Sequence, residues 1–161
     1  MNRHRHRSGR GFSLIELVIV VVIIAIIGAI AIPRLSRGSA GAADSALVGN
    51  LAMLRKAIDA YGAEHGGTYP GASTVADQLT LYTDDSGGTS ATKDSTHIYG
   101  PYLRTVPPLS VGAKKGQNGI AAASASTVGW IYDATNGAIR PNTTDTSPGE
   151  ADAKGTLYSS Y

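Results

Sequence analysis

The strongest pattern in the sequence is a long apolar run near its start that contains one charged residue. Residues 12–32 are apolar or small except for Ser13 and Glu16. As a helix rising ~1.5 Å per residue, they would extend about 31 Å, enough to cross the hydrocarbon core of a bilayer. A carboxylate within such a span costs ~2.5–3.5 kcal/mol on insertion scales, so Glu16 marks a functional position. The pattern predicts a membrane-spanning helix over residues 12–33.

A second hydrophobic pattern predicts that this helix continues past Pro33. Its apolar positions are spaced alternately by four and three residues, which places them on one helix face. They are Leu47, Leu51, Leu54, Ile58 and Tyr61. Gly66-Gly67 then ends the pattern as a C-terminal glycine cap does. We expect one long helix from residue 12 to about 65, apolar all round in its first half and amphipathic in its second half.

The rest of the chain predicts a small domain rich in β-structure. Residues 68–97 are polar and read mainly as loop, with a short helical turn within residues 75–82. Residues 127–133 and 138–140 are β-prone and flank Asn136-Gly137, the strongest short-range signal of a hairpin. Trp130 is then expected to pack in the core or on a face of the hairpin. The predicted fold class is α+β, a long N-terminal helix packed on a small antiparallel β-sheet domain.

Composition and charge narrow the classes of function. The absence of cysteine excludes thiol catalysis and thiolate metal sites. The formal charge is +2, but residues 1–11 hold four of the 14 basic residues. The remainder has 10 basic and 12 acidic residues, which argues against a nucleic-acid-binding surface. The sequence contains no hydrolase, zinc-protease or phosphate-loop motif, so we expect no enzymatic activity.

The order of features at the N-terminus resembles a known processing motif. A leader with Arg3, Arg5, Arg7 and Arg10 precedes the segment Gly11-Phe12-Ser13-Leu14-Ile15-Glu16-Leu17. This segment is similar to the prepilin motif of type IV pilins and type II secretion pseudopilins. The resemblance implies cleavage between Gly11 and Phe12 by a prepilin peptidase and N-methylation of Phe12. Glu16 would become the fifth residue of the mature chain and Pro33 the twenty-second.

The resemblance also implies a topology and a domain organisation. Basic residues before a hydrophobic segment stay on the cytoplasmic side, so the C-terminus should point outward. We expect a basic leader peptide at 1–11, a single-pass transmembrane and filament-core helix at 12–33, and a pilin-like globular domain at 34–161. This domain would include the amphipathic helix to about residue 66. The chain would reside in the bacterial inner membrane with its domain in the periplasm, and later in a filament.

Glu16 is the residue to which the resemblance assigns assembly. Cleavage would expose the α-amino group of Phe12, about one helical turn from Glu16. The two charges could neutralise each other within one chain or, as the resemblance implies, between neighbours in a homo-oligomeric filament. The other implied partners are the prepilin peptidase, an inner-membrane assembly platform and minor pseudopilins. Because Pro33 removes a backbone donor and crowds the carbonyl of Ala29, we predict a helix that is continuous in an isolated subunit but loosened between Gly28 and Pro33 in a filament.

Within this group, the chain is most similar to the major pseudopilin of type II secretion. The absence of cysteines and the segment Gly100-Pro101-Tyr102-Leu103 support this subgroup. The subgroup usually continues with an Asp-Pro-Trp-Gly stretch, whereas this chain has Pro107-Pro108-Leu109-Ser110. The first alternative is a type IV pilus subunit for adhesion, motility or DNA uptake. The second is an exported soluble binding domain with an ordinary signal peptide cut after Ala31 of Ala29-Ile30-Ala31.

The acidic residues near the C-terminus raise the question of calcium. Major pseudopilins bind calcium through acidic residues of a loop near this end, and this chain has Asp145, Glu150 and Asp152 there. These residues do not reproduce the ligand pattern of that subgroup, and an exposed polar tail accounts for them. We expect no metal and no other cofactor, although calcium is the ion that an oxygen-rich loop of this kind could bind.

Overall fold

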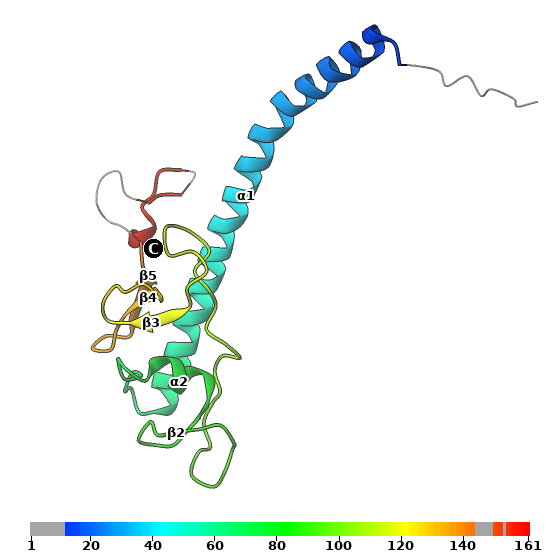
Figure 1. Ribbon diagram of the computed structural model, residues 1–161. Helices are drawn as coiled ribbons and strands as arrows, with labels where there is room; N and C mark the ends of the chain where they lie inside the picture. Colours follow the sequence, from blue (N-terminus) through cyan, green and yellow to red (C-terminus); the bar gives the residue numbers. More distant parts are fainter. Residues whose placement is uncertain (1–11, 144–149, 153) are drawn as a thin grey trace, which may run out of the picture. The chain divides into compact units, whose positions relative to one another are not determined.

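The computed structural model describes residues 12–143, 150–152 and 154–161, apart from the side chains of residues 31–38. It divides into two compact units, Met1–Ser39 and Ala40–Tyr161, which are treated separately. One helix, α1 (Leu14–Glu64), contributes residues to both units (Figure 1). Its assignment is unbroken through Gly28 and Pro33. The loosening expected in a filament concerns another state of the chain and stays a prediction.

In the first unit, α1 carries apolar side chains all round, as its sequence predicts. The large apolar residues from Leu14 to Ile30 are exposed by between 46% and 80%. Within the described part of the chain, none of the helices combines the length and the apolar character that crossing a bilayer requires. The expected span of residues 12–33 extends into residues 31–33, whose side chains lie outside the described set.

In the second unit, α1 presents one apolar face to the domain core. The predicted stripe is confirmed: Leu47, Leu51, Leu54, Ile58 and Tyr61 are each at most 3% exposed. The neighbouring Val48 and Met53 are each 49% exposed, which shows how sharply the two faces of the helix differ. Burial of this stripe against the rest of the domain holds this half of the helix, because an amphipathic helix is stabilised mainly by tertiary packing.

The end of α1 is set by the two glycines that the sequence analysis identified. The Gly67 N–H donates to the carbonyl of Gly62 at 2.7 Å, and Gly66 has φ 64°. This is the geometry of a glycine C-cap, in which a residue of positive φ lets the chain turn back on the last carbonyls. After the turn come α2 (Val75–Thr80) and the antiparallel pair β1 (Tyr82–Thr83) and β2 (Thr89–Ser90). This hairpin lies in a segment that the sequence analysis interpreted as loop.

A three-stranded sheet packs its inner face into the same core. Its strands are β3 (Gly119–Ala121), β4 (Val128–Asp133) and β5 (Ala138–Pro141), in the order β3-β4-β5. The β4–β5 hairpin at Asn136-Gly137 is confirmed, with Tyr132 opposite Ile139. Trp130 is fully buried, as expected, and its Nε1–H donates to the carbonyl of Pro107 at 2.8 Å.

The sheet differs from the prediction in one respect, because β3 pairs with β4 in parallel. The sheet is therefore mixed rather than purely antiparallel. The segment just before β3 approaches the backbone of β4 closely at Gly129. A Cβ atom at this position would collide with the carbonyl of Gln117, so this approach requires glycine. The same carbonyl accepts a hydrogen bond from the N–H of Leu109 at 2.8 Å, which links the segment before β3 to the segment around Leu109.

The C-terminal segment returns to the second half of α1. Its short 3-10 helix η1 (Tyr158–Ser160) begins with Tyr158 and is followed by Tyr161, and both tyrosines pack against the core. The Tyr158 hydroxyl donates to Asp44 Oδ1 at 2.5 Å, and the Arg55 guanidinium donates to the carbonyls of Ile139 and Tyr161. These polar contacts tie the last residues to α1 and to β5.

Candidate functional site

The first turn of α1 brings together residues that the sequence analysis assigned to processing and assembly. Phe12 and Ser13 precede the helix, which begins at Leu14, and the Phe12 side chain is 82% exposed. The N–H of Leu17 donates to the carbonyl of Ser13 at 3.2 Å, which closes the first turn. Gly11, on the other side of the expected cleavage point, lies outside the described residues.

Glu16 folds back to cap this turn. The backbone N–H of Ser13 donates to Glu16 Oε2 at 3.2 Å. Ser13-Leu14-Ile15-Glu16 has the spacing of a capping box, in which the residue at the third helical position accepts a hydrogen bond from the N-cap N–H. A negative charge is also favoured there, because the unpaired N–H groups give the helix N-terminus a partial positive charge.

Ser13 is thus a hydrogen-bonding neighbour of Glu16 that the sequence analysis did not identify. The signal was present, because a serine followed three residues later by glutamate before an apolar run is a recognised helix start. The cap places the carboxylate at the N-terminal end of the helix, toward Phe12. An amine created at Phe12 would therefore lie close in sequence to an already positioned carboxylate.

The two residues expected to weaken the helix lie farther along α1. A Cβ atom on Gly28 would have no heavy atom within 4 Å, so none of the described contacts requires glycine there for close packing. Pro33 lies in the helix, but its side chain is outside the described set. The structure brings neither residue to Glu16, which lies more than three helical turns before Gly28.

The acidic residues near the C-terminus are engaged by protein donors. Glu150 Oε1 accepts the N–H of Ala113, and Asp152 Oδ1 accepts the N–H groups of Lys154 and Thr156 at 2.8 Å each. The Tyr161 hydroxyl donates to Asp152 Oδ2 at 2.6 Å, which lowers the pKa of that carboxyl. Asp145 lies outside the described residues. Among those described, no group of three His, Asp or Glu side chains is placed to hold a metal ion.

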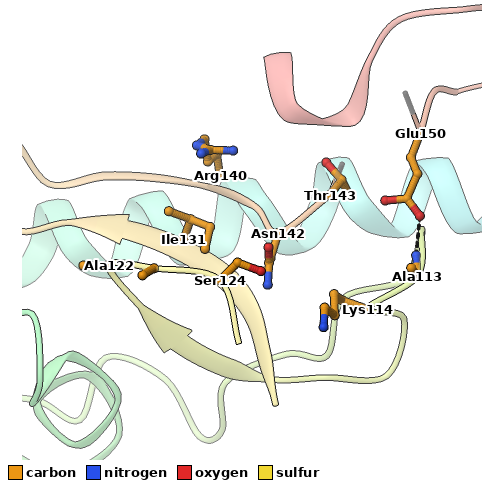
Figure 2. Close-up of a pocket in the computed structure, with 10 residues that line it drawn as sticks. Ala113, Lys114, Ala122, Ser124, Ile131, Arg140, Asn142, Thr143 and Glu150 are labelled. Atoms are coloured by element: carbon orange, nitrogen blue, oxygen red, sulfur yellow. Dashed lines mark hydrogen bonds between the residues drawn. The ribbon is translucent and has the colours of Figure 1, made fainter. Parts of the chain in front are cut away.

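A cavity of about 350 Å³ lies against the outer face of the sheet (Figure 2). Its lining includes Lys114, Ser124, Ile131, Arg140 and Glu150. Asn142 also faces it, but its Nδ2–H donates to the buried carbonyl of Val128 at 2.7 Å. The described lining contains no histidine, so the hydroxyl of Ser124 has no imidazole base there.

Comparison with known proteins singles out the N-terminal segment. The family model described as the prokaryotic N-terminal methylation motif matches residues 6–32. No curated protein and no solved structure matches the chain. The matched segment contains Gly11, Phe12 and Glu16 and ends just before Pro33. The motif supports a type IV pilin-like protein that is exported and anchored through its N-terminal segment.

Proposed function

We propose that this chain is the subunit of a pilin-like filament and that, more specifically, it serves in the pseudopilus of a type II secretion system. The methylation motif at residues 6–32 carries the first part of the proposal. The motif implies processing by a prepilin peptidase, which would remove residues 1–11 and methylate Phe12. The freed subunit would stay anchored in the inner membrane through residues 12–33 until assembly.

The proposed mechanism requires no covalent chemistry from the subunit itself. The exposed apolar surface from Leu14 to Ile30 would leave lipid for contacts with the same segment of other subunits. Glu16 is the only charged residue between Phe12 and Ile32. In a bundle of apolar helices, the α-amino group of Phe12 on one subunit would be the natural partner of Glu16 on another. Such pairing would fix the axial register of the subunits.

The assignment to secretion rather than to a pilus depends on weaker features. The chain has no cysteine and carries Gly100-Pro101-Tyr102-Leu103. This segment packs on α2, where the N–H groups of Tyr102 and Leu103 both donate to the carbonyl of Leu79. The assembly platform and minor pseudopilins would be its partners in such a system. A type IV pilus subunit is the alternative that shares the same N-terminal features.

The first experiment determines the N-terminus of the mature protein. Intact mass or N-terminal sequencing of membrane-derived protein should give a chain that starts at Phe12, with the added mass of one methyl group. The variant Gly11→Val should accumulate as full-length precursor, because the family's peptidase requires the small residue there. Gly28→Val, which changes a glycine of the same segment outside the cleavage point, is the matched control and should be processed normally.

A chain that starts at Ile32 would contradict the filament proposal and support the soluble alternative with an ordinary signal peptide. The choice between secretion and a pilus is tested separately. Deletion of the gene for this chain in its natural host should abolish the secretion of folded proteins, whereas surface pili should persist. Loss of pili with normal secretion would contradict the pseudopilus assignment and leave the pilin-like assignment intact.

A further inference from the structure

The chain contains two Asn-Gly steps, and such steps are prone to a spontaneous reaction of the backbone. They are Asn118-Gly119, where β3 begins, and Asn136-Gly137, in the β4–β5 turn. In this reaction the backbone nitrogen of the second residue attacks the side-chain amide carbon of the asparagine. Glycine allows the attack because it has no side chain to hinder the approach. Both asparagines are exposed, so exposure does not distinguish the two steps.

The β4–β5 turn holds both reacting groups of Asn136-Gly137 in place. The Oδ1 atom of Asn136 accepts the N–H of Ala138 at 2.9 Å, and the Gly137 N–H donates to the carbonyl of Asp133 at 2.9 Å. The ring of Tyr69 lies against Gly137, where an added Cβ atom would be only 2.6 Å from it. The attack would therefore have to break both hydrogen bonds within a packed turn.

Asn118 is held less firmly than Asn136. The described part of the chain offers no hydrogen-bond partner to its side-chain amide. The Gly119 N–H donates to the carbonyl of Thr127 at 3.1 Å, where the pairing of β3 with β4 is irregular between Gly119 and Ile120. This hydrogen bond lies at the end of a strand of only three residues, where local opening is easiest. Its opening alone frees the Gly119 nitrogen to reach the amide carbon of Asn118.

We propose that Asn118-Gly119 is a site of spontaneous deamidation in the folded protein and that the β4–β5 turn protects Asn136-Gly137 from the same reaction. The Gly119 nitrogen loses its proton to hydroxide and forms a bond to Cγ of Asn118, while the Cγ–Nδ2 bond breaks and ammonia leaves with a proton from water. Water then opens the resulting cyclic imide at either carbonyl, which gives aspartate or isoaspartate and adds a negative charge. This proposal goes beyond filament assembly and does not depend on it.

The reaction would alter the start of β3. The imide nitrogen carries no hydrogen, so the hydrogen bond from Gly119 to the Thr127 carbonyl is lost when the ring forms. Isoaspartate then lengthens the backbone by one carbon directly after Gln117, whose carbonyl lies against the backbone of Gly129. We expect isoaspartate, but not aspartate, to loosen β3 from β4.

Incubation of the full chain in detergent, in mildly alkaline water labelled with oxygen-18, tests the proposal. The new carboxyl group carries the label, whereas deamidation during later digestion in ordinary water adds none. Trypsin cleavage after Lys115 and Lys154 gives one peptide with both steps, because Arg140 is followed by proline, and fragment masses locate the label. Asn118 should acquire label roughly two- to ten-fold faster than Asn136, as expected when one hydrogen bond fewer has to open. In urea, where neither step is held, the two rates should be similar.

Equal rates in the folded protein, or faster labelling at Asn136, would overturn the proposal. So would an Asn118 that is labelled in urea but not in the folded chain. The control Asn118→Gln should nearly abolish labelling at that position and leave Asn136 unchanged, because the longer side chain disfavours ring closure.

The structural consequence is tested by hydrogen exchange of the isoaspartate fraction of the aged protein. Asn118→Asp is the matched control, because it carries the same added charge without the extra backbone carbon. The amides of β3 should lose protection in the isoaspartate fraction and keep it in Asn118→Asp. Equal protection in the two proteins would refute the expected loosening of β3.

Discussion

The assembly proposal is tested most sharply by separating the charge of Glu16 from its hydrogen bond. Glu16→Ala removes both the charge and the acceptor that caps Ser13 N–H at 3.2 Å. Glu16→Gln removes the charge but keeps a side-chain oxygen of the same reach, and glutamine serves as well as glutamate at this position of a capping box. The two variants therefore divide the capping role from the role in charge pairing.

The expected magnitudes of the two roles are far apart. Loss of a helix cap costs about 0.5–2 kcal/mol. Removal of one partner of a buried charge pair costs ~3–5 kcal/mol, because the other charge is left without compensation. At 1.4 kcal/mol per factor of ten, the second effect weakens subunit association roughly a hundred-fold or more. If the charge is what matters, Glu16→Gln should fail to assemble nearly as completely as Glu16→Ala.

The assay compares filament yield at equal amounts of processed protein. Each variant is expressed beside the wild type, membrane levels and N-termini are matched, and sheared filaments are counted. Both variants should be processed and inserted, and Glu16→Asp should assemble partially because its shorter side chain reduces the reach. Normal filaments from Glu16→Gln together with none from Glu16→Ala would refute charge pairing and leave Glu16 as a cap.

Two further predictions concern the stability of the domain. Leu47→Ala should lower the free energy of unfolding by about 2–5 kcal/mol in chemical denaturation because Leu47 is fully buried, whereas Val48→Ala on the exposed face should change it by less than about 0.5 kcal/mol. The hydrogen bond from Tyr161 lowers the pKa of the Asp152 carboxyl. The stabilisation that the ionised Asp152 gives the folded state is therefore present above about pH 4 and is lost as the pH falls through the lowered pKa. Acid should therefore release residues 154–161 in hydrogen exchange, and Asp152→Asn should remove that dependence on pH. Release at the same pH in Asp152→Asn would assign it to another group.

The parts of the fold that could be predicted are those encoded by local patterns. The stripe from Leu47 to Tyr61 is a period that only a helix satisfies, and Gly66-Gly67 supplies the positive φ that ends it. The Asn136-Gly137 turn likewise specifies the β4–β5 hairpin, with Gly137 at φ 72°. In each case, neighbouring residues contain both the element and its boundary.

The parts that could not be predicted depend on residues distant in the sequence. The parallel β3–β4 pair follows a connection of only residues 122–127, whereas parallel strands usually need a crossover of a dozen or more residues. The absence of a side chain at Gly129 of β4 lets Gln117, just before β3, approach the β4 backbone, which this pairing requires. Similarly, Arg55 reaches Ile139 and Tyr161 rather than a neighbour on its own helix. A local sequence pattern cannot predict hydrogen-bond partners that lie so far away in the sequence.

The candidate site shows the same division, and this bears on how Glu16 could act. Its position in the motif and its cap are local, whereas its partner in assembly would be on another molecule. The cap uses only part of the hydrogen-bonding capacity of the Glu16 carboxylate. A carboxylate has two oxygens and about four lone-pair sites, so it can accept the Ser13 N–H and bind an amine at the same time. The positive end of α1 disfavours an ammonium group at the start of the same helix but favours the carboxylate. Because a Phe12 amine stays at the start of its own helix, this opposition is the same whichever Glu16 it pairs with. The capped carboxylate keeps acceptor sites for an amine of its own chain or of a neighbour, and Glu16→Gln tests whether its charge is what assembly requires.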